Sequence, residues 1–195
     1  MTPASGRRAL GLAESYRGTD ADSKSTFAGA VVRADRTVDD FVFARCSVGG
    51  RDATDAAIDA WDRLDRPDVR YLFVAGVAPA WYNILDLDAI ADAIDRPVLS
   101  ISFEESDGLE AGIADAFEGD ERARRLRAYR RLPDRHRLDL ENGPLFVRSV
   151  GLDPDTAATI VDAYTFDRRP EPLRIAKRLA RRADAAGRDG TFDFE

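Results

Sequence analysis

The chain has 195 residues, of which 44% are hydrophobic and 33% are charged, and its formal net charge is −7 at pH 7. This length and hydrophobic fraction predict one folded domain rather than two domains or a disordered chain. No stretch approaches the roughly 18 consecutive apolar residues of a membrane span, and no apolar signal segment is visible, so we expect a cytoplasmic protein without membrane association. The single cysteine, Cys46, excludes an internal disulfide and a cysteine-rich metal site.

The distribution of charged residue types is more informative than the net charge. Only Lys24 and Lys177 are lysines among the 29 basic residues, and 27 aspartates stand against 9 glutamates. This pattern is typical of halophilic proteins from a salt-rich cytoplasm. Because the Debye length falls to about 3 Å at 1 M salt, the acidic net charge argues only weakly against a nucleic-acid partner.

The first part of the chain predicts three strands, over residues 8–14, 26–33 and 37–46, with a tight turn at 34–36. Two glycines then precede a helix over 55–64, for which Thr54 is the expected N-cap. A buried strand starts at Tyr71 and stops at Ala75-Gly76. After a polar and aromatic loop, the chain predicts a helix over 86–94 and a strand over 97–103.

The second part of the chain predicts helices and one hairpin. Helices are expected from Ser106-Asp107 to about 117 and over 121–131, followed by a hairpin of strands 137–140 and 145–150 around Asn142-Gly143. A helix over 154–164 and an amphipathic helix over 172–186 complete the chain. We therefore expect a single domain over 1–187 and a flexible tail over 188–195.

The order of these elements predicts the fold class. Three consecutive antiparallel strands followed by strand–helix units give a mixed five-stranded α/β sheet, three strands antiparallel and two parallel, with helices on both faces. This is the arrangement of the ribonuclease H-like fold, with a C-terminal hairpin and helices added. In that fold, acidic side chains at the strand ends hold divalent metal for phosphodiester cleavage.

Four stretches of the chain resemble one family. They are GLAES (11–15), VGGRDAT (48–54), VAGVAPAWYNILDL (74–87) and RPEPLRIA (169–176). Together they are similar to the archaeal endonuclease dU family, which is related to endonuclease V. The resemblance implies a ribonuclease H-like fold, dependence on Mg²⁺ or Mn²⁺, and cleavage of DNA that contains deaminated bases such as uracil and hypoxanthine.

The resemblance also implies roles for individual residues. Two aspartates of the family pattern fall on Ala13 and Ala75, and a further acid of the pattern falls on Glu14. Metal binding and catalysis are therefore assigned to Glu14 and Asp52. Substrate binding is assigned to the matching positions Trp81, Tyr82, Asn83 and Arg174.

Each assignment has a simpler alternative. Glu14 would be a solvated carboxylate at a strand end, and Asp52 an acid stabilised by a helix dipole. Trp81 and Tyr82 would form a partly buried aromatic lid, and the arginine-rich helices would pair with neighbouring acids. Alanines at 13 and 75 keep a second hypothesis open, in which the protein is a catalytically degenerate module that binds nucleic acid or a partner through the same fold.

Overall fold

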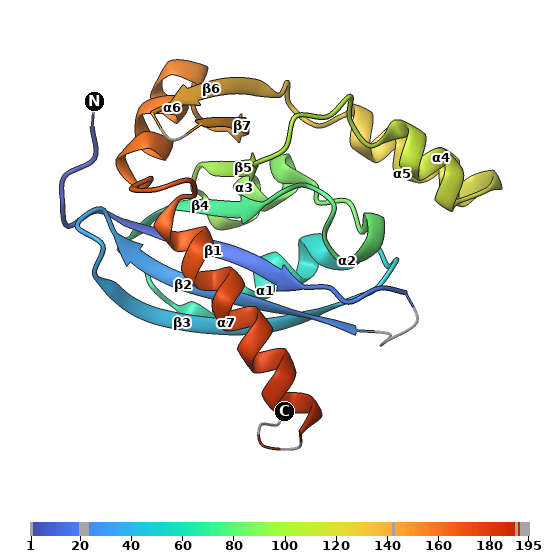
Figure 1. Cartoon of the computed structure of the whole chain (residues 1–195), viewed down its shortest axis with the longest axis horizontal. Helices are drawn as coiled ribbons and strands as arrows, with labels where there is room; N and C mark the ends of the chain where they lie inside the picture. Colours follow the sequence, from blue (N-terminus) through green and yellow to red (C-terminus); the bar gives the residue numbers. More distant parts are fainter. Residues whose placement is uncertain (1, 20–23, 142, 190, 192–195) are drawn as a thin grey trace.

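The computed structural model describes residues 2–19, 24–141, 143–189 and 191. Its centre is one mixed sheet of seven strands in the order β3-β2-β1-β4-β5-β7-β6 (Figure 1). The parallel pairs are β1/β4 and β4/β5, and all other neighbours are antiparallel. The strands are β1 (Arg8–Ser15), β2 (Lys24–Arg33), β3 (Val38–Ser47), β4 (Val69–Ala75), β5 (Val98–Ser102), β6 (His136–Leu140) and β7 (Gly143–Val150).

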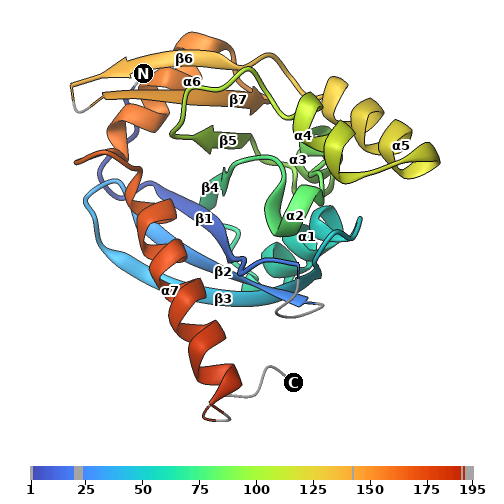
Figure 2. The same ribbon diagram turned by 45° about the vertical axis from the view of Figure 1, so that its right-hand side comes forward.

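Helices cover both faces of this sheet, as Figures 1 and 2 show. Helices α1 and α3 pack on one face and α6 and α7 on the other, while α4 and α5 stand beyond the short turn α2. The helices are α1 (Ala53–Leu64), α2 (Pro79–Tyr82), α3 (Leu87–Ile94), α4 (Glu110–Ala116), α5 (Gly119–Arg130), α6 (Pro154–Ala163) and α7 (Glu171–Arg188).

The central strands are apolar on both faces because both are covered. In β1, Leu10 and Leu12 point to the core under α1 and α3, whereas Ala9 and Ala13 point to the α6 and α7 side. Strand β4 alternates in the same way, with Leu72 on the first side and Phe73 on the second. This period-2 pattern of a doubly covered strand explains the near-continuous apolar runs in the sequence.

Helix α7 lies against β1 and β2 because small residues let the backbone of the helix approach the backbone of the sheet. A Cβ atom on Gly11 would lie 2.3 Å from the carbonyl carbon of Pro172, in the first turn of α7. One turn further along α7, Ala176 packs against Ala13 and Ala30 of the sheet. This close contact fixes the start of α7 over the end of β1.

The predicted fold class is confirmed, with one correction to the sheet. The C-terminal hairpin was expected to stand apart from a five-stranded sheet, but β7 pairs with β5 and extends the sheet to seven strands. The pairing joins residues about 50 positions apart, which local sequence patterns do not reveal. Strand β2 also starts at Lys24, two residues earlier than expected.

The helix boundaries bring smaller corrections. Helix α1 starts at Ala53 with Asp52 as its N-cap residue, and the hydroxyl of Thr54 accepts a hydrogen bond from the Asp86 backbone instead. Helix α7 continues to Arg188, beyond the expected end of the domain. Residues 190 and 192–195 of the expected tail lie outside the described residues. None of the described helices is long and apolar enough to cross a membrane.

The contact between Gly11 and Pro172 leads to a stability prediction. Gly11→Ala places a methyl group against the backbone of α7, and overpacking of this kind costs about 1–3 kcal/mol in the free energy of unfolding. Guanidinium chloride unfolding followed by circular dichroism measures the change. Gly6→Ala is the matched control, because a Cβ there meets nothing within 4 Å. Equal midpoints for the two variants would contradict this account of how α7 docks.

Candidate functional site

A buried amide joins three segments at one end of the sheet. The side chain of Asn83 is 0% exposed. Its Nδ2 donates to the Ser47 carbonyl at 2.9 Å and to Asp52 Oδ1 at 2.7 Å, and its Oδ1 accepts from the Ala53 backbone at 3.0 Å. Asn83 therefore ties the end of β3 and the start of α1 to the turn that follows β4.

Asp52 is saturated with hydrogen-bond donors. Besides Asn83, the backbone N–H and the hydroxyl of Ser47 donate to its carboxylate at 2.9 Å and 2.7 Å. Partial burial alone would raise the pKa of the Asp52 carboxyl, but these hydrogen bonds outweigh it and hold that pKa below its usual range. The ammonium of Lys24 lies 3.7 Å away. This carboxylate is a structural anchor for the helix start.

The turn of α2 has an unusual backbone. Ala80, Trp81 and Tyr82 have φ values of 47°, 59° and 58°, in the left-handed region that non-glycine residues seldom occupy. The rings of Trp81 and Tyr82 pack against Phe117, with centroids 4.8 Å and 5.9 Å away. Such strain persists only where surrounding contacts hold it, and it clusters at functional sites.

Arg125 of α5 supplies much of that restraint. Its side chain is only 5% exposed, and its guanidinium donates to the carbonyl oxygens of Tyr82, Gly49 and Gly50. Gly49 has a φ of +64°, and a Cβ there would lie 2.8 Å from the Trp81 ring. The strained turn is thus held between a glycine loop and a buried arginine.

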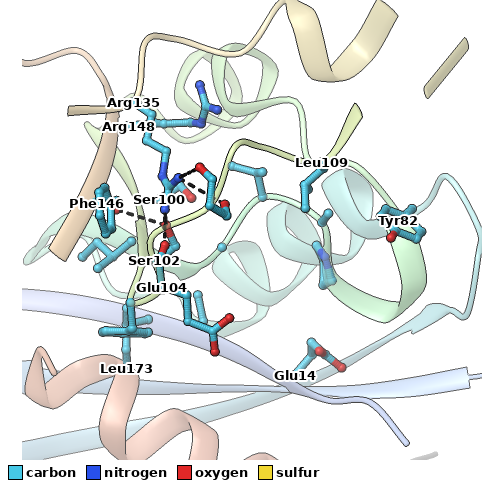
Figure 3. Close-up of a pocket in the computed structure, with 18 of the residues that line it drawn as sticks. Glu14, Tyr82, Ser100, Ser102, Glu104, Leu109, Arg135, Phe146, Arg148 and Leu173 are labelled. Carbon is cyan, nitrogen blue, oxygen red and sulfur yellow. Dashed lines mark hydrogen bonds between the residues drawn. The ribbon is translucent and has the colours of Figure 1, made fainter. Parts of the chain in front are cut away.

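A cavity of about 580 Å³ opens beside this turn, at the carboxyl ends of β1, β4 and β5 (Figure 3). This is where open α/β sheets usually bind ligands, and the volume is in the usual range for small-molecule sites. Its walls come from the ends of these strands, from β7, from the loop after β5 and from the start of α7. The charged and aromatic residues that line it are Glu14, Tyr16, Trp81, Tyr82, Phe103, Glu104, Tyr129, Arg135, Phe146, Arg148, Arg169 and Lys177.

One side of the cavity is basic through Arg135 and Arg148, and a third arginine of the cavity, Arg169, lies near Lys177. The guanidinium groups of Arg135, Arg148 and Arg169 lie over the rings of Phe146, Tyr129 and Phe103, at 4.0 Å, 5.5 Å and 4.3 Å from the ring centroids. Within the described part of the chain, none of the three has a carboxylate oxygen within 4.0 Å. Burial, and then the charge of Arg148, lowers the pKa of Arg135. Arg135 donates to oxygens of Ser102, Ser106 and Glu104, and Arg148 to oxygens of Pro133 and Tyr129. What these two arginines offer an anionic ligand is therefore chiefly their positive charge, which no carboxylate neutralises at close range.

The other side of the cavity carries the acids and an amine. Figure 3 shows the carboxylates of Glu14 and Glu104 on the lower side and Arg135 and Arg148 on the upper side. Ser25 donates to Glu14 Oε2 at 2.7 Å, and Lys177 Nζ donates to the Glu14 carbonyl oxygen at 2.5 Å. Burial lowers the pKa of the Lys177 ammonium, and the neighbouring Glu14 opposes this shift.

The structure divides the residues predicted for the site. Glu14, Trp81 and Tyr82 line the cavity, whereas Asp52 and Asn83 lie in the hydrogen-bond network behind the turn. Asn83 is fully buried, and its amide holds the segments behind the turn through the hydrogen bonds described above.

Arg174 is not among the residues that line the cavity. Its guanidinium forms a bidentate ion pair with the Glu171 carboxylate, with N···O distances of 2.6–3.0 Å. Leu173 and Lys177 are the residues of α7 that line the cavity.

The residues at this site do not fit the metal centre that the fold implies. Ala13 and Ala75, at the positions of two expected acids, belong to an apolar cluster under Ala176. In the described ranges of the chain, no group of three or more histidine, cysteine, aspartate or glutamate side chains is placed to hold a metal ion. A pair of hard cations needs several carboxylate oxygens, and Asp52 has its oxygens committed to hydrogen bonds.

Four basic residues of the cavity were missing from the sequence-based site: Arg135, Arg148, Arg169 and Lys177. Arginines are so common in this chain that their positions alone do not separate them from ion-paired ones. In the arginine-rich helix α5, such pairing with acids is observed: Arg124 and Arg125 pair with Glu121, and Arg130 pairs with Glu110. The rarity of lysine, however, was a signal that could have pointed to Lys177.

The strand order and the helix placement define a ribonuclease H-like fold, which this chain shares with solved structures of endonuclease V. Endonuclease V from Bacillus subtilis aligns over 97% of this chain and 86% of its own, with a TM-score of 0.65 at 14% identity. Ciona intestinalis endonuclease V, solved in complex with a DNA that contains an inosine, aligns over 90% and 85% with a TM-score of 0.58 at 14% identity. At these identities the likeness shows the fold.

The family follows from the sequence comparisons. The family model for endonuclease dU matches residues 5–183, and the chain belongs to this family. A UPF0215 protein of Pyrobaculum calidifontis is 33% identical over 174 residues, which cover 88% of this chain and 93% of that protein. The structure of a protein of unknown function from Archaeoglobus fulgidus aligns over 89% of this chain and 95% of its own, with a TM-score of 0.76 at 24% identity.

The buried amide network gives a second stability prediction. Asn83→Ala leaves the Ala53 N–H and the Asp52 carboxylate without their partner, and we expect a loss of about 1–3 kcal/mol in the free energy of unfolding at neutral pH. Because the pKa of Asp52 is lowered in the folded state, its contribution is present at neutral pH and is lost as the pH falls through that pKa. The difference between wild type and variant should therefore narrow in acid.

Denaturant unfolding at several pH values measures this effect. Asp92→Ala, an exposed substitution on α3, is the control. A loss for Asn83→Ala no larger than that of the control would contradict the anchoring role.

Proposed function

We propose that this protein binds a DNA strand at the cavity, with phosphate groups against the basic side, and that it does so without metal-assisted hydrolysis. The observation that carries the proposal is the set of three arginines, Arg135, Arg148 and Arg169, which lie over aromatic rings and have no carboxylate within 4.0 Å in the described structure. Membership of the endonuclease dU family supports DNA as the polyanion.

The volume of the cavity, about 580 Å³, is sufficient for one nucleotide that is turned out of a duplex or held in a single strand. Guanidinium groups bind phosphate oxygens bidentately, and aromatic side chains stack on bases whatever their sequence. Trp81 and Tyr82 border the same cavity on the strained turn, so a base and its phosphate would meet different walls. Damaged or mismatched bases are the least costly to turn out of a duplex.

Binding is tested by fluorescence anisotropy with labelled oligonucleotides. The set comprises a single strand, an undamaged duplex, and duplexes with one uracil or one hypoxanthine, titrated over a series of KCl concentrations. We expect saturable binding that weakens as salt rises, with Arg148→Gln or Arg135→Gln reducing affinity tenfold or more and lowering the salt slope by about one.

Arg130→Gln is the matched control for this test. It removes an exposed arginine that is paired with Glu110 outside the cavity, so its affinity should stay close to that of the wild type. If all three variants bind equally well, the cavity is not the DNA site. Unfolding midpoints are compared first, because both arginines also hold the fold: Arg148 donates to Pro133 and Tyr129, and Arg135 to Ser102, Ser106 and Glu104.

The second candidate function is the endonuclease activity that the family name describes, with Mg²⁺ or Mn²⁺ as cofactor. Family membership favours this activity. The lack of metal-ligating side chains at Ala13 and Ala75, and the hydrogen bonds that occupy the Asp52 carboxylate, argue against it. We expect no nicking of uracil- or hypoxanthine-containing duplexes with either metal under conditions where binding is saturated. The readout is denaturing gel electrophoresis of a labelled strand. Metal-dependent nicking that Glu14→Gln abolishes would establish the endonuclease instead.

A further inference from the structure

Lys177 is an exception to the composition of this protein. Of the 29 basic residues only two are lysines, and Lys177 lines the cavity. It follows Leu173 by one turn of α7, and its Nζ donates to the Glu14 carbonyl oxygen at 2.5 Å. Lys24, the other lysine, has a half-exposed side chain and contacts Ser47 and Asp52, outside the cavity lining.

A lysine does chemistry that an arginine cannot. An unprotonated ε-amine is a nucleophile that forms a covalent bond to a carbonyl carbon, whereas the guanidinium group keeps its proton and its charge. Lys177 is half-buried and has no carboxylate oxygen within 4.0 Å in the described structure, a setting that disfavours its charged form. The one cationic residue of the cavity that is able to act as a nucleophile is therefore also poorly solvated.

Other side chains that line the same cavity supply the groups that such a reaction needs. The carboxylates of Glu14 and Glu104 share the lower side of the cavity, where they are able to accept a proton (Figure 3). Arg135 and Arg148, on the opposite side, supply positive charge that attracts an anionic leaving group. The cavity thus combines an amine, two carboxylates and an anion-binding wall.

We propose that Lys177 is a Schiff-base nucleophile that attacks the aldehyde of an abasic deoxyribose in a bound DNA strand. This rests on the proposed function, since the DNA must first occupy the cavity. The substrate would be supplied by a reaction that hydrolyses a damaged base from its sugar. The activity is a lyase reaction that needs no metal.

The chemistry balances without an oxidant or a reductant. The Nζ lone pair attacks C1′ of the ring-opened sugar, and loss of one water gives an imine. Glu14 or Glu104 takes a proton from C2′, the C3′–O bond breaks, and the phosphate leaves with the bonding electrons toward the arginines. Water then hydrolyses the imine, which returns the amine and releases an unsaturated aldehyde on the 5′ fragment.

Borohydride trapping tests this proposal directly. The full-length protein is incubated with a labelled duplex that carries one abasic site, and sodium borohydride reduces any imine to a stable amine. We expect a covalent complex on a denaturing gel for wild type and Lys24→Arg, and at least a tenfold loss of that complex for Lys177→Arg. Mass spectrometry of the digested wild-type complex should place the adduct on Lys177. This measurement does not depend on the folding of any variant.

The same samples separate the two proposals. Anisotropy measures the binding of abasic DNA, which Lys177→Arg should retain because its positive charge is kept. Binding without any trapped complex, or an adduct on Lys24 or on the terminal amine, overturns the inference and leaves the proposed function standing. Absence of binding by the wild type overturns both.

Discussion

The buried side chain of Asn83 is the constraint on which the functional end of the molecule depends. Its amide holds the end of β3, the first residue of α1 and the turn after β4 in one hydrogen-bonded unit. A buried amide whose donors and acceptor are all satisfied specifies one arrangement, because any shift leaves polar groups unpaired in the interior. The left-handed turn of Ala80, Trp81 and Tyr82 is held after its last residue by this unit and by Arg125, and at Ala80 by a hydrogen bond from the Gly49 backbone.

The restrained turn explains how a strained backbone can border a binding cavity. Each left-handed residue costs on the order of 1 kcal/mol or more, and the surrounding contacts must supply that energy. In return, two aromatic rings are fixed on Phe117 without depending on a flexible loop. A wall that is already ordered loses less conformational entropy when a ligand binds.

The sequence was sufficient for the fold class but not for the site. Local patterns predicted most of the strands and helices, and Asp86 and Asp153 cap their helices through their side chains as such residues should. The pairing of β5 with β7 depends on contacts between distant segments, which no local pattern contains.

The same limit applies to the charged residues of the site. Whether an arginine such as Arg148 faces a carboxylate or an aromatic ring depends on its neighbours in space. The motif around Asp52 and Asn83 was easy to recognise, and its residues hold the site together from behind. A motif in a sequence can thus mark the support of a site as readily as its reactive surface.

The hydrogen bond between Lys177 and Glu14 has a consequence for folding. It joins residues 163 positions apart, so one wall of the cavity is missing until the last long helix has docked on the first strand. Contacts of such high sequence separation carry a large loop-closure entropy and tend to form late. A folding intermediate with the sheet assembled but α7 undocked would have no complete cavity, so ligand binding is restricted to molecules that have reached their final tertiary structure.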